Sequence, residues 1–254
     1  MAKRSIDLMK IRVMSYNTQS GFANGRQIHD YIPQAAHMAS VNADVIALQE
    51  VAIRHPHGKP VDYPAAVAEY LGMEYVFAKA LDYADYFPGS EGCYGVAILS
   101  KYPVRHIASL MLPVPDKIEP RAALITQIAA PTPFYMISTH LSFQGEFDGD
   151  AAARVEQLQI IFNCLDANSL YPAILAGDLN SQPQDAAIDC LRKKFDVFND
   201  GRCSLPTAKS SKFGWVQIDY IAAAPQSAVK CLNFFRGDDC TVSDHYAVIA
   251  DLEI

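Results

Sequence analysis

The sequence lacks three features that would each assign it to a particular class of protein. No apolar run approaches the roughly 20 residues that a membrane-spanning helix needs, and the N-terminal segment MAKRSIDLMKIRV has no apolar stretch of the signal-peptide type. The six cysteines show no C-x-x-C spacing, and a chain of 254 residues does not need disulfides to hold its core. These absences predict a cytoplasmic protein with free thiols and no membrane span.

Positive charge is also scarce. The chain has 21 Lys and Arg against 28 Asp and Glu, a formal net charge of −7. Proteins that bind long nucleic acid gain affinity by displacing phosphate counterions, which requires a basic stripe. The densest basic cluster, residues 192–194, is expected to be a solvated helix end. Nucleic acid is therefore a possible partner that the charge does not favour.

Hydrophobic residues, by contrast, are plentiful. They make up 50% of the 254 residues, enough for one sizeable core. A chain of this length buries around three quarters of the surface that it exposes when unfolded. No repeat, low-complexity tract or Gly/Ser linker divides it. We therefore expect a single domain over residues 1–254; the sequence does not indicate an oligomeric state.

Strand-like and helix-like segments follow one another in mixed order. Helical spacing of apolar residues, with Gly72 as a C-cap in one case, predicts helices over residues 28–41, 64–71 and 151–165. Short runs of strand-forming residues predict strands over residues 11–16, 44–48, 75–78, 95–99, 122–128, 134–138, 173–176, 217–222 and 245–252.

Polar side chains capable of catalysis or metal binding repeatedly stand at the ends of these apolar runs. They are Asn17, Glu50, His140, Asp178, Asn180, Asp219, Asp244 and His245. One carboxylate at a strand end is usually a turn former. Eight such positions indicate a shared cleft, because strand ends can direct side chains from a rigid scaffold into one place.

An ordered set of motifs resembles the endonuclease/exonuclease/phosphatase superfamily, the DNase I-like metal-dependent phosphohydrolases. The segments are VMSYNTQ, DVIALQEV, YGVAILSKYPV, ISTHLS, AILAGDLNSQP, VQIDYIA and TVSDHYAVIADLEI. The resemblance implies an α+β fold: a four-layer αββα sandwich of two mixed β-sheets packed face to face, with helices outside. Val96 is a departure, since the family often has Asn there.

The resemblance also implies a metal site formed by Asn17, Glu50 and Asp244. Mg²⁺, with Mn²⁺ as a substitute, suits such oxygen ligands, whereas no Cys/His cluster has zinc spacing. The alternative for Glu50 is a surface carboxylate that ends a strand.

The Asp178-Leu179-Asn180 spacing places both polar side chains on one face of an extended segment. By resemblance, Asp178 orients or deprotonates the attacking water and Asn180 contacts phosphate. A simple turn is the alternative, because both residue types hydrogen-bond to nearby backbone.

By the same resemblance, His245 stabilises charge on the phosphate, Asp219 holds its imidazole, and His140 is a second phosphate donor. Each histidine could instead be a hydrogen-bonded structural residue. Arg121 could approach phosphate, or it could be an ordinary surface or salt-bridged arginine. His55 and His57 are expected at the surface.

The implied function is a phosphoesterase that hydrolyses a compact phosphodiester such as a lipid headgroup, nucleotide or sugar phosphate. A DNA or RNA nuclease and a silent phospho-ligand-binding protein are the alternatives. Aromatic residues in three loops could stack on a substrate ring or form a small core of their own. These loops cover residues 82–94, residues 143–149 with Phe143 and Phe147, and a segment with Lys209, Lys212, Phe213 and Trp215.

Overall fold

The computed structural model describes residues 8–23, 28–115, 118–143, 150–200, 205–210 and 214–254, in which two six-stranded sheets pack face to face. Phe147, Lys212, Phe213 and Cys203 lie outside these residues. The first sheet has the order β15 (Lys230–Arg236), β16 (Val248–Glu253), β1 (Lys10–Asn17), β4 (Val45–Ile53), β6 (Cys93–Ser100), β5 (Glu74–Asp82). The second has the order β11 (Asp196–Val197), β14 (Asp219–Ala224), β10 (Ala173–Asp178), β9 (Phe134–His140), β8 (Arg121–Ile128), β7 (Val104–Leu112).

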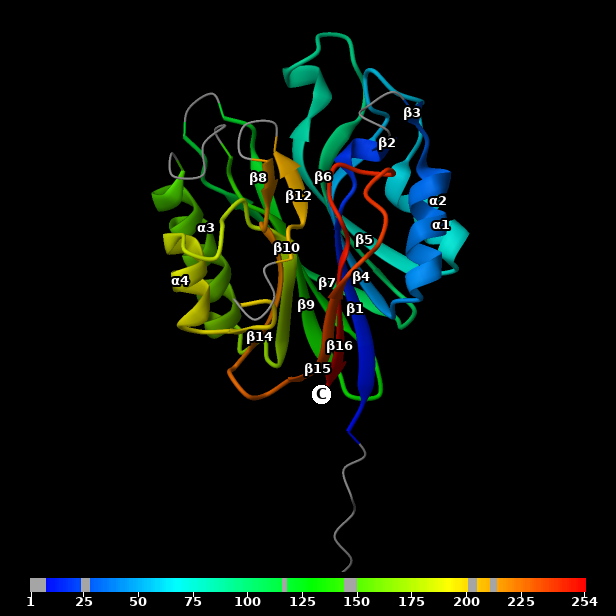
Figure 1. The fold of residues 1–254 in the computed structure, drawn as a ribbon. Helices are drawn as coiled ribbons and strands as arrows, with labels where there is room; N and C mark the ends of the chain where they lie inside the picture. The colour runs from blue at the N-terminus through cyan, green and yellow to red at the C-terminus, as the bar shows by residue number, and fades with distance from the viewer. Residues whose placement is uncertain (1–7, 24–27, 116–117, 144–149, 201–204, 211–213) are drawn as a thin grey trace, which may run out of the picture.

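Both sheets are mixed and both are covered by helices on the outside (Figure 1). β1 pairs with β4 in parallel, as β9 does with β10, and the other pairs within the two sheets are antiparallel. Helices α1 (Tyr31–Val41) and α2 (Tyr63–Leu71) cover the first sheet, and α3 (Ala151–Ala167) and α4 (Ala186–Arg192) cover the second. The predicted αββα sandwich is confirmed.

The central strands are apolar on both faces because each face meets another layer. In β1, Ile11 and Val13 face the second sheet, while Met14 and Tyr16 pack in the cluster beneath α1 and α2. Successive side chains of a strand point to opposite faces. A strand that is buried on both sides therefore appears as a continuous apolar run, which is why these strands could be predicted from the sequence.

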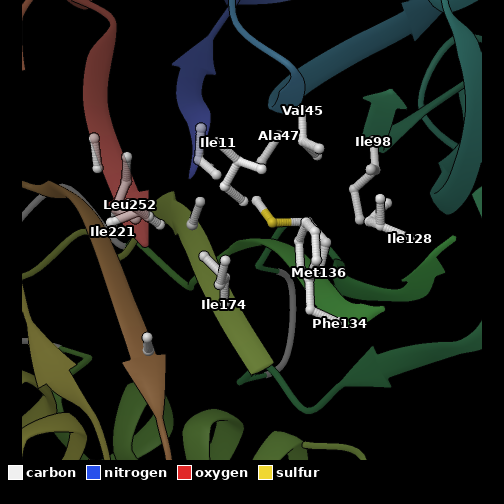
Figure 2. Close-up of a cluster of buried hydrophobic side chains, with 14 of the residues drawn as sticks. Ile11, Val45, Ala47, Ile98, Ile128, Phe134, Met136, Ile174, Ile221 and Leu252 are labelled. Carbon is white, nitrogen blue, oxygen red and sulfur yellow. The ribbon is translucent and has the colours of Figure 1, made fainter. Parts of the chain in front are cut away.

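The core between the sheets draws side chains from both of them (Figure 2). Phe134 and Met136 of β9 are fully buried there, opposite Val45 of β4 and Ile98 of β6. The rings and branched side chains fill the space between the layers, so the sandwich depends on their volume.

Phe134→Ala is expected to lower the free energy of unfolding by about 3–5 kcal/mol, because it removes a buried ring and leaves a cavity between rigid sheets. Urea denaturation measures this loss. Tyr70→Ala is the matched control, since Tyr70 is 50% exposed on α2 and its loss should cost less than about 0.5 kcal/mol. A loss below about 1 kcal/mol for Phe134→Ala would contradict a well-packed interface between the sheets.

Helix and strand boundaries differ from the prediction in places. The helix predicted from residue 28 begins at Tyr31, because the Asp30 carboxylate accepts the Ile32 N–H at 3.0 Å and caps it. The end of α2 at Gly72 is confirmed, with that residue in the left-handed conformation at φ 64°. The strand predicted over residues 245–252 begins only at Val248, so the catalytic candidate His245 precedes it.

Strands β7 and β15 were not predicted. Each lies at the edge of its sheet and leaves several side chains exposed, which interrupts the apolar run that marks a buried strand. Two small hairpins, β2 (Phe22–Ala23) with β3 (Ile28–His29) and β12 (Ala208–Ser210) with β13 (Gly214–Val216), complete the described strands. None of the helices in the described residues is both long and apolar enough to cross a membrane.

Candidate active site

Asn17 connects the two sheets at one end of the sandwich. It is the last residue of β1, and its Nδ2 donates to Glu50 Oε1 at 3.1 Å and to Asp178 Oδ2 at 3.0 Å. Glu50 belongs to the first sheet and Asp178 to the second. In Figure 1, β16 ends at the bottom beside the labelled C-terminus, and its antiparallel neighbour β1 therefore ends at the top, with Asn17.

Strand register brings three more of the predicted residues to the same end. Asp178 is the last residue of β10; it is paired with His140, the last residue of the parallel strand β9. On its other side it is paired with Asp219, the first residue of the antiparallel strand β14. Side chains of directly paired residues project from the same face and are close enough to interact. The prediction that strand ends meet in one place is confirmed for these three residues.

The position of Glu50 in its strand differs from the prediction. It does not follow the end of a strand; it lies inside β4, where the pairing with β6 shifts between Leu48 and Val51. Its φ of 51° is left-handed, which is uncommon for a residue other than glycine. The Thr18 N–H and hydroxyl contact the Gln49 carbonyl, both at 3.0 Å, and support the bulge. Bulges redirect side chains, and this one directs Glu50 towards Asn17.

Asp178 stands at the centre of the assembled groups. Its Oδ2 accepts from Asn17 and lies 3.5 Å from His140 Nε2 and 3.7 Å from His245 Nε2. Its Oδ1 accepts the Asn180 N–H at 2.9 Å. Burial, and then the negative charge of Asp219, raise the pKa of Asp178 to about 7. A carboxylate with such a pKa can both hold a water molecule and accept its proton near neutral pH.

His245 and Asp219 form a buried hydrogen-bonded pair. His245 Nδ1 lies 2.9 Å from Asp219 Oδ2, so Nε2 is the nitrogen left facing Asp178. Burial alone would lower the pKa of His245, but the negative charges of Asp219 and Asp178 raise it well above its usual value. These charges favour the cationic form of His245, a suitable form for stabilising a phosphoryl oxygen.

His140 has the opposite electrostatic character. Burial lowers its pKa well below the usual value, and the positive charges of Arg121 and His245 add to this effect. Asn180 Nδ2 lies 3.0 Å from His140 Nε2 and also donates to the Leu141 carbonyl at 2.9 Å. The hydrogen bond to the Leu141 carbonyl shows that the amide nitrogen, not the oxygen, of Asn180 lies next to His140. Neutral His140 Nε2 therefore accepts a hydrogen bond from Asn180 Nδ2. In this arrangement His140 orients Asn180 rather than offering Nε2–H to a phosphate.

Asp244 completes the predicted set beside Glu50. It is exposed, and its Oδ2 accepts from Gln19 Nε2 at 2.6 Å. Burial, and then the charge of Asp244, raise the pKa of Glu50. Such mutual repulsion is what a divalent cation would relieve, and carboxylate and amide oxygens are ligands that Mg²⁺ accepts. Asn17, Glu50 and Asp244 therefore fit a hard cation.

A second group of possible ligand atoms lies deeper. Asp178, Asp219 and His245 each offer one atom, all within 4.8 Å of one another, and Asp219 Oδ1 is buried without a hydrogen-bond partner in the described part of the chain. The bond between Asp219 Oδ2 and His245 Nδ1 already occupies one atom of each residue. Asp219 Oδ1 and His245 Nε2 are therefore the atoms that these two residues could offer to a cation.

Arg121, which the sequence left undecided, is buried beside the site. It begins β8, is 6% exposed, and its Nη1 pairs with Glu119 and lies 3.4 Å from the Tyr94 hydroxyl. Tyr94 in turn lies 3.4 Å from His140 Nδ1. Of the alternatives left open for Arg121, the salt bridge is present, with Glu119, and the surface location is wrong. The motif Glu-Pro-Arg at the start of an apolar strand was the available indication, because it placed a cation where the other polar residues stand at strand ends.

His55 and His57, both predicted at the surface, differ from one another. His57 is exposed, but His55 is half-buried and its ring lies 5.0 Å from that of Phe22 and 5.2 Å from that of Tyr83. The segment with His55 thus contacts two other segments, at Phe22 and at Tyr83, through aromatic rings. The surface prediction fails for His55 because these contacts join residues far apart in the sequence.

Known proteins are similar to nearly the whole of this chain. Residues 14–245 match the endonuclease/exonuclease/phosphatase family. Among curated proteins, no significant match was found. An endonuclease/exonuclease/phosphatase from Beutenbergia cavernae has a similar solved structure, with a TM-score of 0.73 and 23% identity, covering 96% of this chain and 72% of that one.

Two further solved structures are similar over nearly the whole chain. The human Nocturnin catalytic domain, solved with a bound sulfate anion, has a TM-score of 0.66 and 17% identity, covering 96% of this chain and 93% of that one. ANGEL2, a 2′,3′-cyclic phosphatase, has a TM-score of 0.69 and 14% identity, covering 98% and 96%. At these identities the likeness shows a shared fold.

Proposed function

Because the chain belongs to the endonuclease/exonuclease/phosphatase family, we propose that it is a Mg²⁺-dependent phosphodiesterase that hydrolyses a compact phosphodiester. Members of this family are hydrolases of phosphoesters and are generally dependent on divalent metals. The observation that most supports the proposal is the convergence of Asn17, His140 and His245 on one oxygen of Asp178.

In the proposed reaction, Asp178 holds the attacking water and accepts its proton. The water oxygen bonds to phosphorus, and the P–O bond to the leaving group breaks. His245, protonated and held by Asp219, donates from Nε2 to a phosphoryl oxygen as negative charge grows there. Asn180, held by its hydrogen bonds to His140 and to the Leu141 carbonyl, is proposed to contact the phosphate. The fixed positions of these groups reduce the reorganisation that the reaction would need in water.

Asn17, Glu50 and Asp244 are the proposed metal-holding residues, with Mn²⁺ able to replace Mg²⁺. A bound divalent cation supplies charge neutralisation at the phosphoryl oxygens. Asn17 Oδ1 already accepts the Gln19 N–H at 3.0 Å, which fixes the amide in one orientation. Through its Nδ2 the same residue links this group to Asp178, so the metal-holding residues and the base share one rigid connection.

Charge favours a compact substrate over long nucleic acid. The net charge is −7, and the densest basic cluster is engaged in ion pairs: Arg192 Nε with Asp200 at 2.8 Å and Lys194 Nζ with Asp166 at 2.6 Å. A continuous basic stripe, which non-specific nucleic-acid binding requires, is therefore not expected. We also place the enzyme in the cytoplasm, because the five described cysteines are all free thiols.

Glu50→Gln tests the metal assignment. It is expected to weaken Mg²⁺ binding by more than about 100-fold, since loss of even an outer partner of a metal ligand costs roughly 10- to 100-fold. Titration calorimetry measures the affinity, and hydrolysis of bis-p-nitrophenyl phosphate measures the activity that should fall with it. Glu156→Gln is the control, because Glu156 is exposed on α3. Mg²⁺ affinity equal to that of the control would show that Glu50 does not hold the metal.

A further inference from the structure

A pocket of about 340 Å³ opens beside Glu50. Its lining divides into two parts. Glu50, Arg121 and Glu119 form a charged end next to the catalytic groups, and His55, Tyr83, Tyr86 and Phe87 form an aromatic end. Of these residues, the proposed reaction uses only Glu50, at the charged end. The aromatic end has no role in bond cleavage.

The aromatic end consists of rings that contact one another mainly by their edges. The Tyr83 ring lies 5.2 Å from that of His55 at an interplanar angle of 73°, and 6.3 Å from that of Phe87 at 59°. Phe87 also meets His57 edge-on, at 5.0 Å and 87°. Aromatic rings attract further rings by offset stacking or edge-to-face contact. This arrangement leaves ring surface available for a planar ligand group.

Exposure distinguishes this group from a small core of its own. Tyr83 is only 5% exposed, but Phe87 is 38% exposed and Tyr86 49% exposed. A small core under a loop would bury its members, as the core clusters of this fold do. Two large rings left open at the mouth of a pocket beside the catalytic residues are better placed to meet a ligand than to stabilise the loop.

The charged end indicates an anionic acceptor on the same ligand. Arg121 is 6% exposed, and its Nε is buried with no hydrogen-bond partner among the described residues. Leaving such a donor unsatisfied is costly, and guanidinium groups match phosphate geometry well. The Tyr83 hydroxyl, close to the Ser20 side chain, also lacks a partner at hydrogen-bonding geometry in the described part of the chain. A ligand with a phosphate and a polar-edged ring would satisfy both.

The size of the pocket restricts the ligand further. Small-molecule sites occupy roughly 300–1,000 Å³, so a pocket of about 340 Å³ holds one ring system and little else. We propose that the aromatic end binds the planar base of a nucleoside phosphodiester while Arg121 contacts its phosphate. This inference rests on the proposed function and narrows its substrate class from compact phosphodiesters to those that contain a nucleobase.

The test compares the binding of two probes that differ only in the ring. Titration calorimetry in the same Mg²⁺ buffer gives the dissociation constants of adenosine 5′-monophosphate and ribose 5-phosphate, and their ratio isolates the base. Stacking of a base on aromatic side chains is worth roughly one to two orders of magnitude in affinity. The wild type should therefore bind the nucleotide at least about tenfold more tightly, and Phe87→Leu or Tyr86→Leu should reduce that ratio severalfold.

Trp215→Leu is the matched control. Trp215 is a 46% exposed aromatic residue on β13, where it packs against Tyr246 rather than against the pocket. Its loss should leave the ratio unchanged, and circular dichroism confirms that each variant is folded. A wild-type ratio near one, no measurable nucleotide binding, or a ratio that falls in Trp215→Leu but not in the pocket variants would overturn the proposal.

The phosphodiesterase function and the base-binding site can be refuted independently of each other. Hydrolysis of bis-p-nitrophenyl phosphate without a nucleotide preference would leave the phosphodiesterase function standing and remove the base subsite. A nucleotide preference that depends on Phe87, without hydrolysis of any phosphodiester, would keep the subsite and refute the function.

Discussion

Asp178→Asn is expected to lower kcat for phosphodiester hydrolysis by about 10³-fold or more, because a positioned general base contributes roughly 10²–10⁴-fold and Asp178 also fixes the neighbouring groups. Asn17, His140 and His245 all lie within 3.7 Å of its Oδ2, so the substitution changes the group at the centre of the site. Initial rates with bis-p-nitrophenyl phosphate at saturating Mg²⁺ measure the effect.

Stability provides an independent check on the same variant. The pKa of Asp178 in the folded protein, about 7, is above its ordinary value of 3.8, so in the metal-free protein the charged carboxylate opposes folding at neutral pH. Asn removes that charge, and the metal-free variant should unfold at a temperature no lower than the wild type does. Asp189→Asn, on an exposed side chain of α4, should change neither property. Near-normal kcat in Asp178→Asn would remove this residue from the mechanism.

His245→Ala is expected to lower kcat/KM by about 10²–10³-fold, the usual cost of losing one donor to a developing oxyanion. Asp219→Asn should cause a comparable loss, because Asp219 acts by holding the His245 imidazole through the 2.9 Å hydrogen bond. Asp219 is thus a positioning residue. Its contribution should exist only while His245 is present.

The double variant His245→Ala/Asp219→Asn tests whether Asp219 acts through His245 or has a separate role. If the residues act as a unit, the double variant should be about as active as His245→Ala alone, since effects within one unit are not additive. Losses that multiply in the double variant would instead show that Asp219 acts independently of His245, as the deeper group of possible metal ligands would allow.

The residues at strand ends were predictable because strand periodicity and register determine their positions. His140, Asp178 and Asp219 each begin or end an apolar strand, and parallel and antiparallel pairing brings those ends together. The order of motifs then indicated the sandwich. Local sequence was sufficient here because both faces of these strands are buried, which makes their boundaries visible as changes from apolar to polar residues.

Glu50 and Arg121 show where sequence reasoning was incomplete. The bulge at Glu50 depends on Thr18, more than 30 residues earlier, and the pattern VIALQEVAI alone does not reveal it. The burial of Arg121 depends on Tyr94 and on the loop that contains Glu119. The aromatic end of the pocket joins two separate segments, around His55 and from Tyr83 to Phe87. Such contacts arise only when the sheets are packed, so they leave no periodic pattern in the sequence.

The most direct test of the central claim is the rate of bis-p-nitrophenyl phosphate hydrolysis by the wild-type chain with Mg²⁺, after EDTA, and after Mg²⁺ is restored in excess. Turnover should disappear with EDTA, return with the metal, and be nearly absent from Asp178→Asn under all three conditions. Turnover that persists in EDTA, or that Asp178→Asn retains in full, would contradict a metal-dependent phosphodiesterase centred on Asp178.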